Sequence, residues 1–351
     1  MNQYLLTLFD RQPRRIRVIE NILKNRRSEA TLFWAYNYRI LGALGAQRQL
    51  NRQDYETQLD QWVREGLLVV DDLQAALTDF GQAQVQEFWQ THYQPHFTQW
   101  AWVTNHQTLS NRVLLALQVI SHFRHHENHY LSLSLSEFEM NRVRQWVRSL
   151  KANDVSVIID QVQAIIAELA QVDQRLALLL TYRLIGYQTS GWTDDQAAQQ
   201  LGVDLDEIPV MWRDIWLKVA TDLATLKGPL SSLVQDLISP SPASQSAMKT
   251  IQSLSNGLSI EQVSQRRRLK IGTVREHVLE IAILLPELIS LPALISESRL
   301  QQLQNLYLYQ GPAFSWEYQE VASDEARAFF EFRLYQIMRC HQDYGDFIST
   351  V

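Results

Sequence analysis

Residues 249–284 constrain the fold of this chain most, because turn signals and helical apolar spacing alternate within one short segment. Asn256-Gly257 is a turn signal, and Ser259 with Gln262 three residues later is the pattern of a capping box at a helix start. A second helix is predicted from about residue 273 by apolar residues at helical spacing, namely Val274, Val278 and Ile281. The segment therefore predicts a helix-turn-helix with a further element leading into it.

The charge of this segment favours DNA binding. Residues 249–280 hold six Lys or Arg against three Glu, whereas the whole chain has a formal net charge of −6. A helix-turn-helix places its second helix in the major groove, and nearby cations contact phosphates. The predicted DNA contacts are Arg266, Arg267, Arg268, Lys270, Thr273, Arg275 and His277. The alternative is a three-helix protein-docking module whose arginine face is only solvated.

The motif also carries a family resemblance. Its letters GLSIEQVS and LKIGTVREHV resemble the helix-turn-helix domain at the C-terminal end of many RecQ-type DNA helicases. The length, the C-terminal placement of the motif and the lack of helicase motifs make the chain similar to the YpbB-like family, whose members accompany a short RecQ-type helicase without its own C-terminal domains. The resemblance implies DNA and a RecQ-type helicase as partners, and a role in DNA repair and recombination. Gly272 stands where many relatives have a side-chain cap, which predicts a weaker start of the second helix.

Composition predicts a mainly α fold. The 351 residues include 35 aromatic side chains (Trp 10, Tyr 13, Phe 12) but only 12 Gly and 9 Pro, which favours long helices over a loop-rich β fold. We expect a winged-helix-like domain at 1–92, a helical middle domain at 93–237, a Pro- and Ser-rich linker at 238–246 and a helix-turn-helix domain at 247–351.

The N-terminal domain is predicted from three helices followed by a hairpin. Residues 11–27 hold seven Lys or Arg against one Glu and are expected to form an amphipathic helix with a basic face. Ser28, Asn51 and Thr78 are expected to cap later helices, and residues 67–77 form the hairpin around Asp71-Asp72. The third helix presents a mixed surface, so a partner-binding or architectural role stands beside a DNA role.

The middle domain offers a second basic strip and an acidic unit. Ser136 with Glu139 predicts a capping box, and the helix after it carries Arg142, Arg144, Arg148 and Lys151. This strip could contact a phosphate backbone or an acidic partner protein, or it could be only a solvated surface. Two apolar helices follow from residue 154. Residues 192–217 have helix-turn-helix rhythm around Gly202, but six acids and a single base predict a structural or protein-facing role.

Histidines and aromatic residues gather at residues 89–130. His122, His125, His126 and His129 have the spacing of one helix face, which is compatible with zinc ligands. One continuous helix encloses a tetrahedral ion poorly, so a solvated or interfacial histidine face is the default, and a role for these residues stays open. The aromatic residues, Trp100 and Trp102 among them, are expected in the core, with base stacking as the alternative.

No pattern for catalysis or cofactor binding is found. The sequence has no phosphate-binding loop, no dinucleotide fingerprint, no nucleophile elbow and no HExxH motif, and its sole cysteine, Cys340, excludes an internal disulfide framework. No secretory signal or long apolar run is present, so a cytoplasmic protein without membrane, cofactor, metal or small-molecule substrate is expected. The sequence thus favours a non-catalytic DNA-binding accessory protein. A transcription regulator and a protein adaptor without DNA contact are the alternatives.

Overall fold

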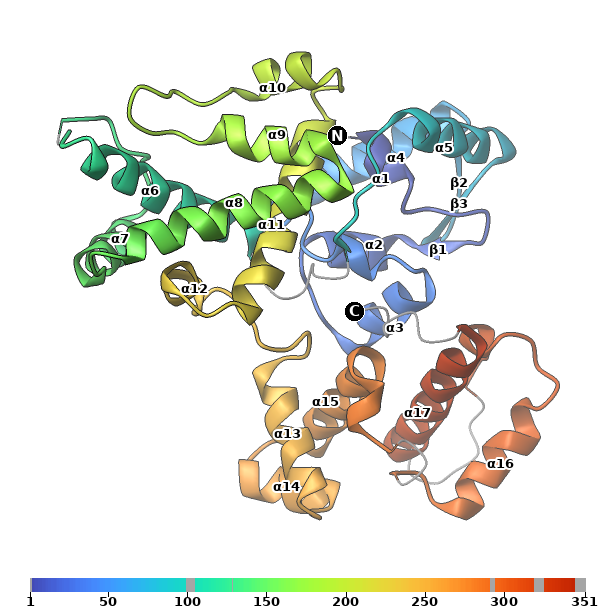
Figure 1. Cartoon of the computed structure of the whole chain (residues 1–351). Coiled ribbons are helices and arrows are strands. Elements are labelled where there is room, and N and C mark those ends of the chain that lie inside the picture. Colours follow the sequence, from blue (N-terminus) through green and yellow to red (C-terminus); the bar gives the residue numbers. More distant parts are fainter. Residues whose placement is uncertain (1, 99–104, 128, 291–293, 319–324, 345–351) are drawn as a thin grey trace. The chain divides into compact units, whose positions relative to one another are not determined.

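The computed structural model describes residues 2–98, 105–127, 129–290, 294–318 and 325–344. Within these ranges the chain is mostly helical with one small three-stranded sheet, so the predicted mainly α fold is confirmed (Figure 1). The chain divides into two compact units. The first unit consists of Met1–Lys24 and Gly42–Pro240, and the second unit consists of Asn25–Leu41 and Ser241–Val351.

The first unit begins with short helices and the small antiparallel sheet. Its elements are α1 (Asn2–Leu6), β1 (Arg14–Arg15), α2 (Ile16–Leu23), α4 (Arg52–Arg64), β2 (Leu68–Asp71), β3 (Gln74–Leu77) and α5 (Asp79–Thr91). The antiparallel sheet has the order β1-β3-β2, so the short first strand pairs with the last. Asp71 lies opposite Gln74, which leaves Asp72 and Leu73 as the turn of the predicted hairpin. The predicted caps Asn51 and Thr78 accept hydrogen bonds from Gln53 N and Gly81 N.

The predicted helix across residues 11–27 is wrong. Arg14 and Arg15 form β1, because they pair with Gln74 and Ala75 of β3, and α2 covers only Ile16–Leu23. The expected basic face is also partly neutralised by ion pairs: Arg14 with Asp10 at 3.1 Å, and Arg17 and Lys24 with Glu20 at 2.5 and 3.6 Å. The residues from Arg14 to Arg27 therefore do not form one continuous basic helix face.

The rest of the first unit is a helical scaffold. It contains α6 (His106–Arg124), α7 (Glu137–Ser149), α8 (Asp154–Val172), α9 (Gln174–Arg183), α10 (Asp194–Leu201), α11 (Glu207–Thr225) and α12 (Pro229–Val234). Its interior is built on α11, whose Ile208, Met211 and Ile215 are fully buried. The helix α8 is the one described helix that is long and apolar enough, by length and composition, to cross a membrane. It packs on α9, and its Glu168 forms an ion pair with Lys218 of α11.

Two carboxylates of the acidic unit, residues 192–217, form hydrogen bonds inside the scaffold. Asp214 is 1% exposed and accepts hydrogen bonds from Tyr93 Oη and from the amides of His96 and Phe97. Glu207 accepts from Tyr93 N at 2.5 Å. The structure has the predicted helix-turn-helix rhythm, with Gly202 left-handed between α10 and α11. Since these two acids hold residues 93–97, the negative charge of this unit is partly structural.

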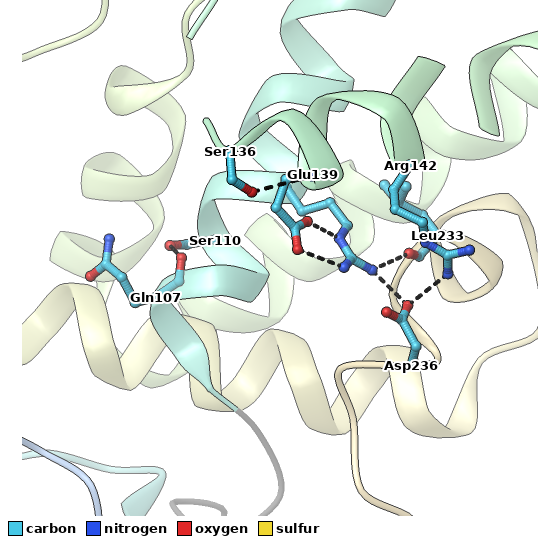
Figure 2. A network of polar contacts seen from close by, with 8 residues as sticks. Gln107, Ser110, Ser136, Glu139, Arg142, Leu233 and Asp236 are labelled. Carbon is cyan, nitrogen blue, oxygen red and sulfur yellow. Dashed lines mark hydrogen bonds and ion pairs between the residues drawn. The ribbon is translucent and has the colours of Figure 1, made fainter. Parts of the chain in front are cut away.

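A fully buried arginine joins three scaffold helices. Arg112 of α6 donates to both carboxylate oxygens of Glu139 at 2.5 and 3.0 Å, to Leu233 O at 3.0 Å and to Asp236 Oδ1 at 2.6 Å (Figure 2). Arg142 Nη2 also donates to Asp236 Oδ1, at 3.0 Å. The predicted capping box at Ser136 is therefore only half formed: Ser136 Oγ accepts from Glu139 N, but the Glu139 carboxylate binds Arg112.

Replacing Arg112 with Ala is expected to lower the free energy of unfolding of the first unit by about 2–3 kcal/mol, because two carboxylates lose their shared partner. Arg142→Ala is the matched control, and it should cost less than about 1 kcal/mol because that pair is partly solvated. Urea denaturation measures both values. Equal effects of the two variants would contradict the structural role of Arg112.

Acid should weaken the same network. Although burial acts to raise the pKa of Asp236, its hydrogen bonds with Arg112 and Arg142 hold that pKa below the usual value. The unfolded chain then binds a proton more readily than the folded one. The contribution of Asp236 is therefore present above about pH 4 and is lost as the pH falls further.

The second unit surrounds a central helix. Its elements are α3 (Glu29–Asn37), α13 (Gln245–Ser255), α14 (Ile260–Arg267), α15 (Ile271–Leu284), α16 (Glu297–Tyr307) and α17 (Glu325–Tyr344). Helix α15 packs against α13, α17 and α3. His341 of α17 links the last two neighbours, since its Nδ1 lies 2.9 Å from Tyr36 Oη of α3 and its Nε2 lies 2.8 Å from Ala282 O of α15. Cys340 is buried in α17.

The two compact units are not made of the same segments as the predicted domains. Helix α3, capped by Ser28 as predicted, contributes Leu32 and Phe33, both 0% exposed, to the second unit. The end of the predicted linker is also structured, because Ser244 caps α13 and its hydroxyl donates to Glu280 of α15. The predicted boundaries at 92, 237 and 246 stay predictions.

Candidate nucleic-acid interface

The turn between α14 and α15 is fixed by hydrogen bonds and one left-handed residue. Ser259 and Gln262 form the predicted capping box of α14, with both of its hydrogen bonds present. Arg268 ends α14 at a φ of 54°, and Ser264 Oγ donates to Leu269 O at 2.7 Å. Because φ values above zero are uncommon for residues other than glycine, the contacts around Arg268 must hold this conformation. The turn therefore presents α15 at a defined angle.

Helix α15 begins earlier than predicted. Lys270 is its N-cap residue and Ile271 its first residue, so Gly272 lies in the first turn and not at the cap. The expectation that Gly272 weakens the helix start as a cap is therefore wrong. The actual cap, Lys270, makes no side-chain hydrogen bond to the helix start. A helix start without such a cap leaves backbone amides available to an anion.

The exposed residues of α15 lie in its first half, at Ile271, Gly272 and Glu276. Val274, Val278 and Ile281 are all 0% exposed, which confirms the predicted apolar face. The last residues, from Ile281 to Leu284, are buried all round because α3 and α17 also cover this end. Ile271 is 40% exposed, and a Cβ on Gly272 would meet nothing within 4 Å. The motif did not single out Ile271, since an apolar first residue is expected to pack inward.

Three of the predicted cations remain available around this helix start. Arg266, Arg268 and Lys270 are exposed, and they come from the end of α14, from the turn and from the cap of α15. We call them the turn cations. Together with the first turn of α15, which no side chain caps, they offer positive charge to phosphate oxygens.

Arg267 serves the fold of the domain. Its Nη1 donates to Ser246 O at 2.8 Å and to the Thr250 hydroxyl, and its Nη2 donates to Ser246 Oγ at 3.0 Å. These bonds fasten α14 to α13. The hydrogen bonds of Arg267 thus set it apart from its exposed neighbours Arg266 and Arg268. The sequence alone does not distinguish these three consecutive arginines.

Arg267→Ala is expected to lower the free energy of unfolding of the second unit by about 1–2 kcal/mol, because it removes charge-assisted hydrogen bonds. The salt dependence of DNA binding should change little. Chemical denaturation and a salt series on the same variant check both statements, with Arg266→Ala as the matched control. If Arg267→Ala left the free energy of unfolding unchanged and lowered the salt dependence of DNA binding as Arg266→Ala does, the structural role of Arg267 would be contradicted.

His277 and Arg275 also face the protein. His277 Nδ1 lies 2.9 Å from Thr250 Oγ1, and burial, with Arg267 adding to it, lowers the pKa of His277. The imidazole is therefore neutral near pH 7 and adds no charge for phosphate binding. The Arg275 guanidinium lies 5.7 Å from the centre of the Phe330 ring of α17. Thr273, in the first turn of α15, is half-buried.

The second basic strip lies on α7 and, with Lys151, just beyond its end in the first unit. Arg144, Arg148 and Lys151 are exposed, whereas Arg142 is bound to Asp236. Arg144 also contacts Asn141 Oδ1 at 3.0 Å. Three cations of the strip thus reach solvent, and their contact with DNA stays a prediction.

The four histidines do not share one helix face. Helix α6 ends at Arg124, and His126 is left-handed with a φ of 56°. His122 stacks on Tyr130 and His125 stacks on Tyr187, at 3.8 and 4.3 Å between ring centres. Within the described ranges no group of three or more His, Cys, Asp or Glu side chains could hold a metal ion. Trp100 and Trp102 lie outside the described residues.

Comparisons with known proteins agree with this geometry. Residues 246–336 match the family model of a helix-turn-helix domain. Over 293 residues the chain is 22% identical to the protein YpbB of Bacillus subtilis (strain 168), and the match covers 80% of this chain and 81% of YpbB. No solved structure matches the chain significantly. The helix-turn-helix domain and the similarity to YpbB are thereby confirmed.

Proposed function

We propose that this protein is a non-catalytic accessory factor that binds DNA through the start of α15 and partners a RecQ-type DNA helicase. One observation carries the DNA-binding part: the exposed turn cations directly precede the solvent-open start of α15 inside a helix-turn-helix domain. A chain of net charge −6 is repelled by DNA as a whole, so binding must depend on such a local site.

The first turn of α15 supplies little base recognition. Ile271 and Gly272 lack hydrogen-bonding side chains, and Thr273 is half-buried. Phosphate contacts position a protein on DNA, whereas base contacts give sequence specificity. We therefore expect this protein to bind DNA with only a modest sequence preference. Such binding suits an accessory factor better than a transcription regulator of one operator.

The helicase part of the proposal rests on the resemblance of the sequence motif to the C-terminal domain of RecQ-type helicases, and the similarity to YpbB is compatible with it. The motor is then a separate polypeptide, and this chain supplies a DNA-docking module in trans, in the cytoplasm and without a cofactor of its own. A docking module bound to the motor raises the effective concentration of DNA without new contacts in the motor.

The test is an unwinding assay with a RecQ-type helicase that lacks its own C-terminal domains, on forked DNA, with and without this protein. Stimulation that disappears when the turn cations are changed to Gln supports the proposal. Stimulation that survives the change favours a protein adaptor without direct DNA contact. Absence of stimulation, together with binding to one symmetric duplex site only, favours a transcription regulator.

A further inference from the structure

A groove lies between α1, α4 and α5 in the first unit, and we call it the α4–α5 groove. It has a volume of about 520 Å³, and a cavity of about 290 Å³ adjoins it, because Gln3, Phe88 and His92 line both. The buried members of its lining, at most 9% exposed, are apolar and form the groove floor: Leu6, Trp62, Leu67, Val85 and Phe88. Volumes of this size are typical of binding sites.

Two carboxylates at the rim of the groove are each held by a glutamine. Gln61 Nε2 donates to Glu65 Oε1 at 2.7 Å, and Gln84 Nε2 donates to Glu87 Oε2 at 3.2 Å. All four side chains are exposed and line the groove, from the end of α4 and from α5. Because each glutamine occupies one oxygen only, the other oxygen of each carboxylate is left to accept hydrogen bonds from a ligand.

The chain does not neutralise these carboxylates. Glu65 and Glu87 take part in no ion pair among the described residues, whereas Glu56, also exposed on α4, is bound by Arg52 at 2.9 Å. The described lining of the groove and of the adjoining cavity contains no Lys or Arg. Its histidine, His92, lies 3.3 Å from a further carboxylate, Asp204. The groove therefore has a negative rim above an apolar floor.

Charge and surface together define the occupant of the groove. The carboxylates repel DNA phosphates, so a nucleic acid is disfavoured. An arginine side chain is favoured, because its planar guanidinium donates to two carboxylate oxygens at once and is more weakly hydrated than an ammonium. The apolar floor gives an additional contact to a segment that also carries an apolar side chain. The residues outside the described ranges contain no Lys or Arg, so they do not supply this cation.

We propose that the α4–α5 groove binds an arginine-bearing segment of a partner protein, with guanidinium groups at Glu65 and Glu87 and an apolar side chain on the groove floor. The groove belongs to the first unit and uses none of the turn cations. This interaction surface therefore goes beyond the proposed DNA docking.

The test is fluorescence anisotropy of the full chain with short labelled peptides that carry arginines at varied spacing around a leucine. A second set of peptides has glutamine in place of arginine, and a third set has serine in place of leucine. The groove variant combines Glu65→Gln with Glu87→Gln. Its matched control combines Asp71→Asn with Asp160→Asn, which removes the same charge from exposed positions that line neither the groove nor the adjoining cavity. Thermal unfolding of the free variants checks the fold.

We expect an arginine peptide to bind with a Kd below about 1 mM. The groove variant should weaken that binding about 10-fold or more and the control much less, because only the groove variant removes the carboxylates that meet the guanidinium groups. Both peptide substitutions should also weaken binding. A variant that lacks the turn cations should still bind the peptides, which separates this surface from the DNA-docking site.

Three results would overturn the proposal. The first is an equal loss of affinity in the groove variant and in its control, since net charge alone would then explain binding. The second is unchanged affinity of the glutamine or serine peptides. The third is no binding of any arginine peptide at about 1 mM.

Discussion

Phe33→Ala is expected to destabilise the second unit by about 3–5 kcal/mol, although residue 33 precedes almost the entire first unit in the sequence. The Phe33 ring is 0% exposed, and the Arg333 guanidinium lies 3.9 Å from its centre. The same arginine forms an ion pair with Glu29 at 3.0 Å. Truncating the ring removes buried apolar surface and leaves Arg333 over a void, so both α3 and α17 lose packing.

Urea denaturation followed by hydrogen exchange measures this effect and locates it. Faster exchange is expected in α15 and α17, while the amides of α8 and α9 in the first unit should keep their protection. Phe80→Ala in α5 is the control, because Phe80 is 57% exposed and its truncation should cost little. If Phe33→Ala changed exchange only in the first unit, α3 would not be part of the second unit.

This membership of α3 could not be predicted from the sequence. The pattern of residues 28–40 correctly predicts a capped helix with a buried apolar face, since Ser28 caps α3 and Leu32, Phe33 and Tyr36 are buried. A periodic apolar face indicates that a helix packs, but not which distant segment it packs against. Sequential elements usually pack together, and that expectation placed residues 28–40 with their sequence neighbours.

Local signals predicted local structure well. The capping box at Ser259, the hairpin around Asp71-Asp72 and the glycine after α10 depend on hydrogen bonds and φ angles within a few residues. The basic helix at residues 11–27 was predicted wrongly, because the pairing of β1 with β3 overrides the helical pattern of Arg14 and Arg15.

At the candidate DNA interface, too, local features were predicted from the sequence, whereas contacts between distant residues were not. Sequence spacing correctly places the inward face of α15, but it does not distinguish Arg267 from Arg266 and Arg268. The three arginines differ only in what lies beside them: Arg267 meets Ser246 and Thr250 of α13, while its neighbours meet solvent. Such differences require three-dimensional contacts. The number of cations available to DNA is therefore smaller than the local charge excess suggests.

Changing Arg266, Arg268 and Lys270 together to Gln is expected to weaken DNA binding about 100-fold at low salt. Each cation that contacts a phosphate releases counterions, so the slope of log affinity against log salt should fall by about 0.9 for each, or by about 3 in total. The fold should be unaffected because all three side chains are exposed. Changing Arg144, Arg148 and Lys151 to Gln is the matched control, called the α7 variant, since it removes three exposed cations from α7 and the residues just after it.

Fluorescence anisotropy of the full chain and these two variants, with duplex, single-stranded and forked DNA across a salt series, tests the central claim most directly. We predict salt-dependent binding by the wild-type chain, a loss of affinity and slope in the turn-cation variant, and a much smaller loss in the α7 variant. No binding to any of these DNAs at low salt, or equal binding by the turn-cation variant and the wild-type chain, would contradict DNA docking through the start of α15.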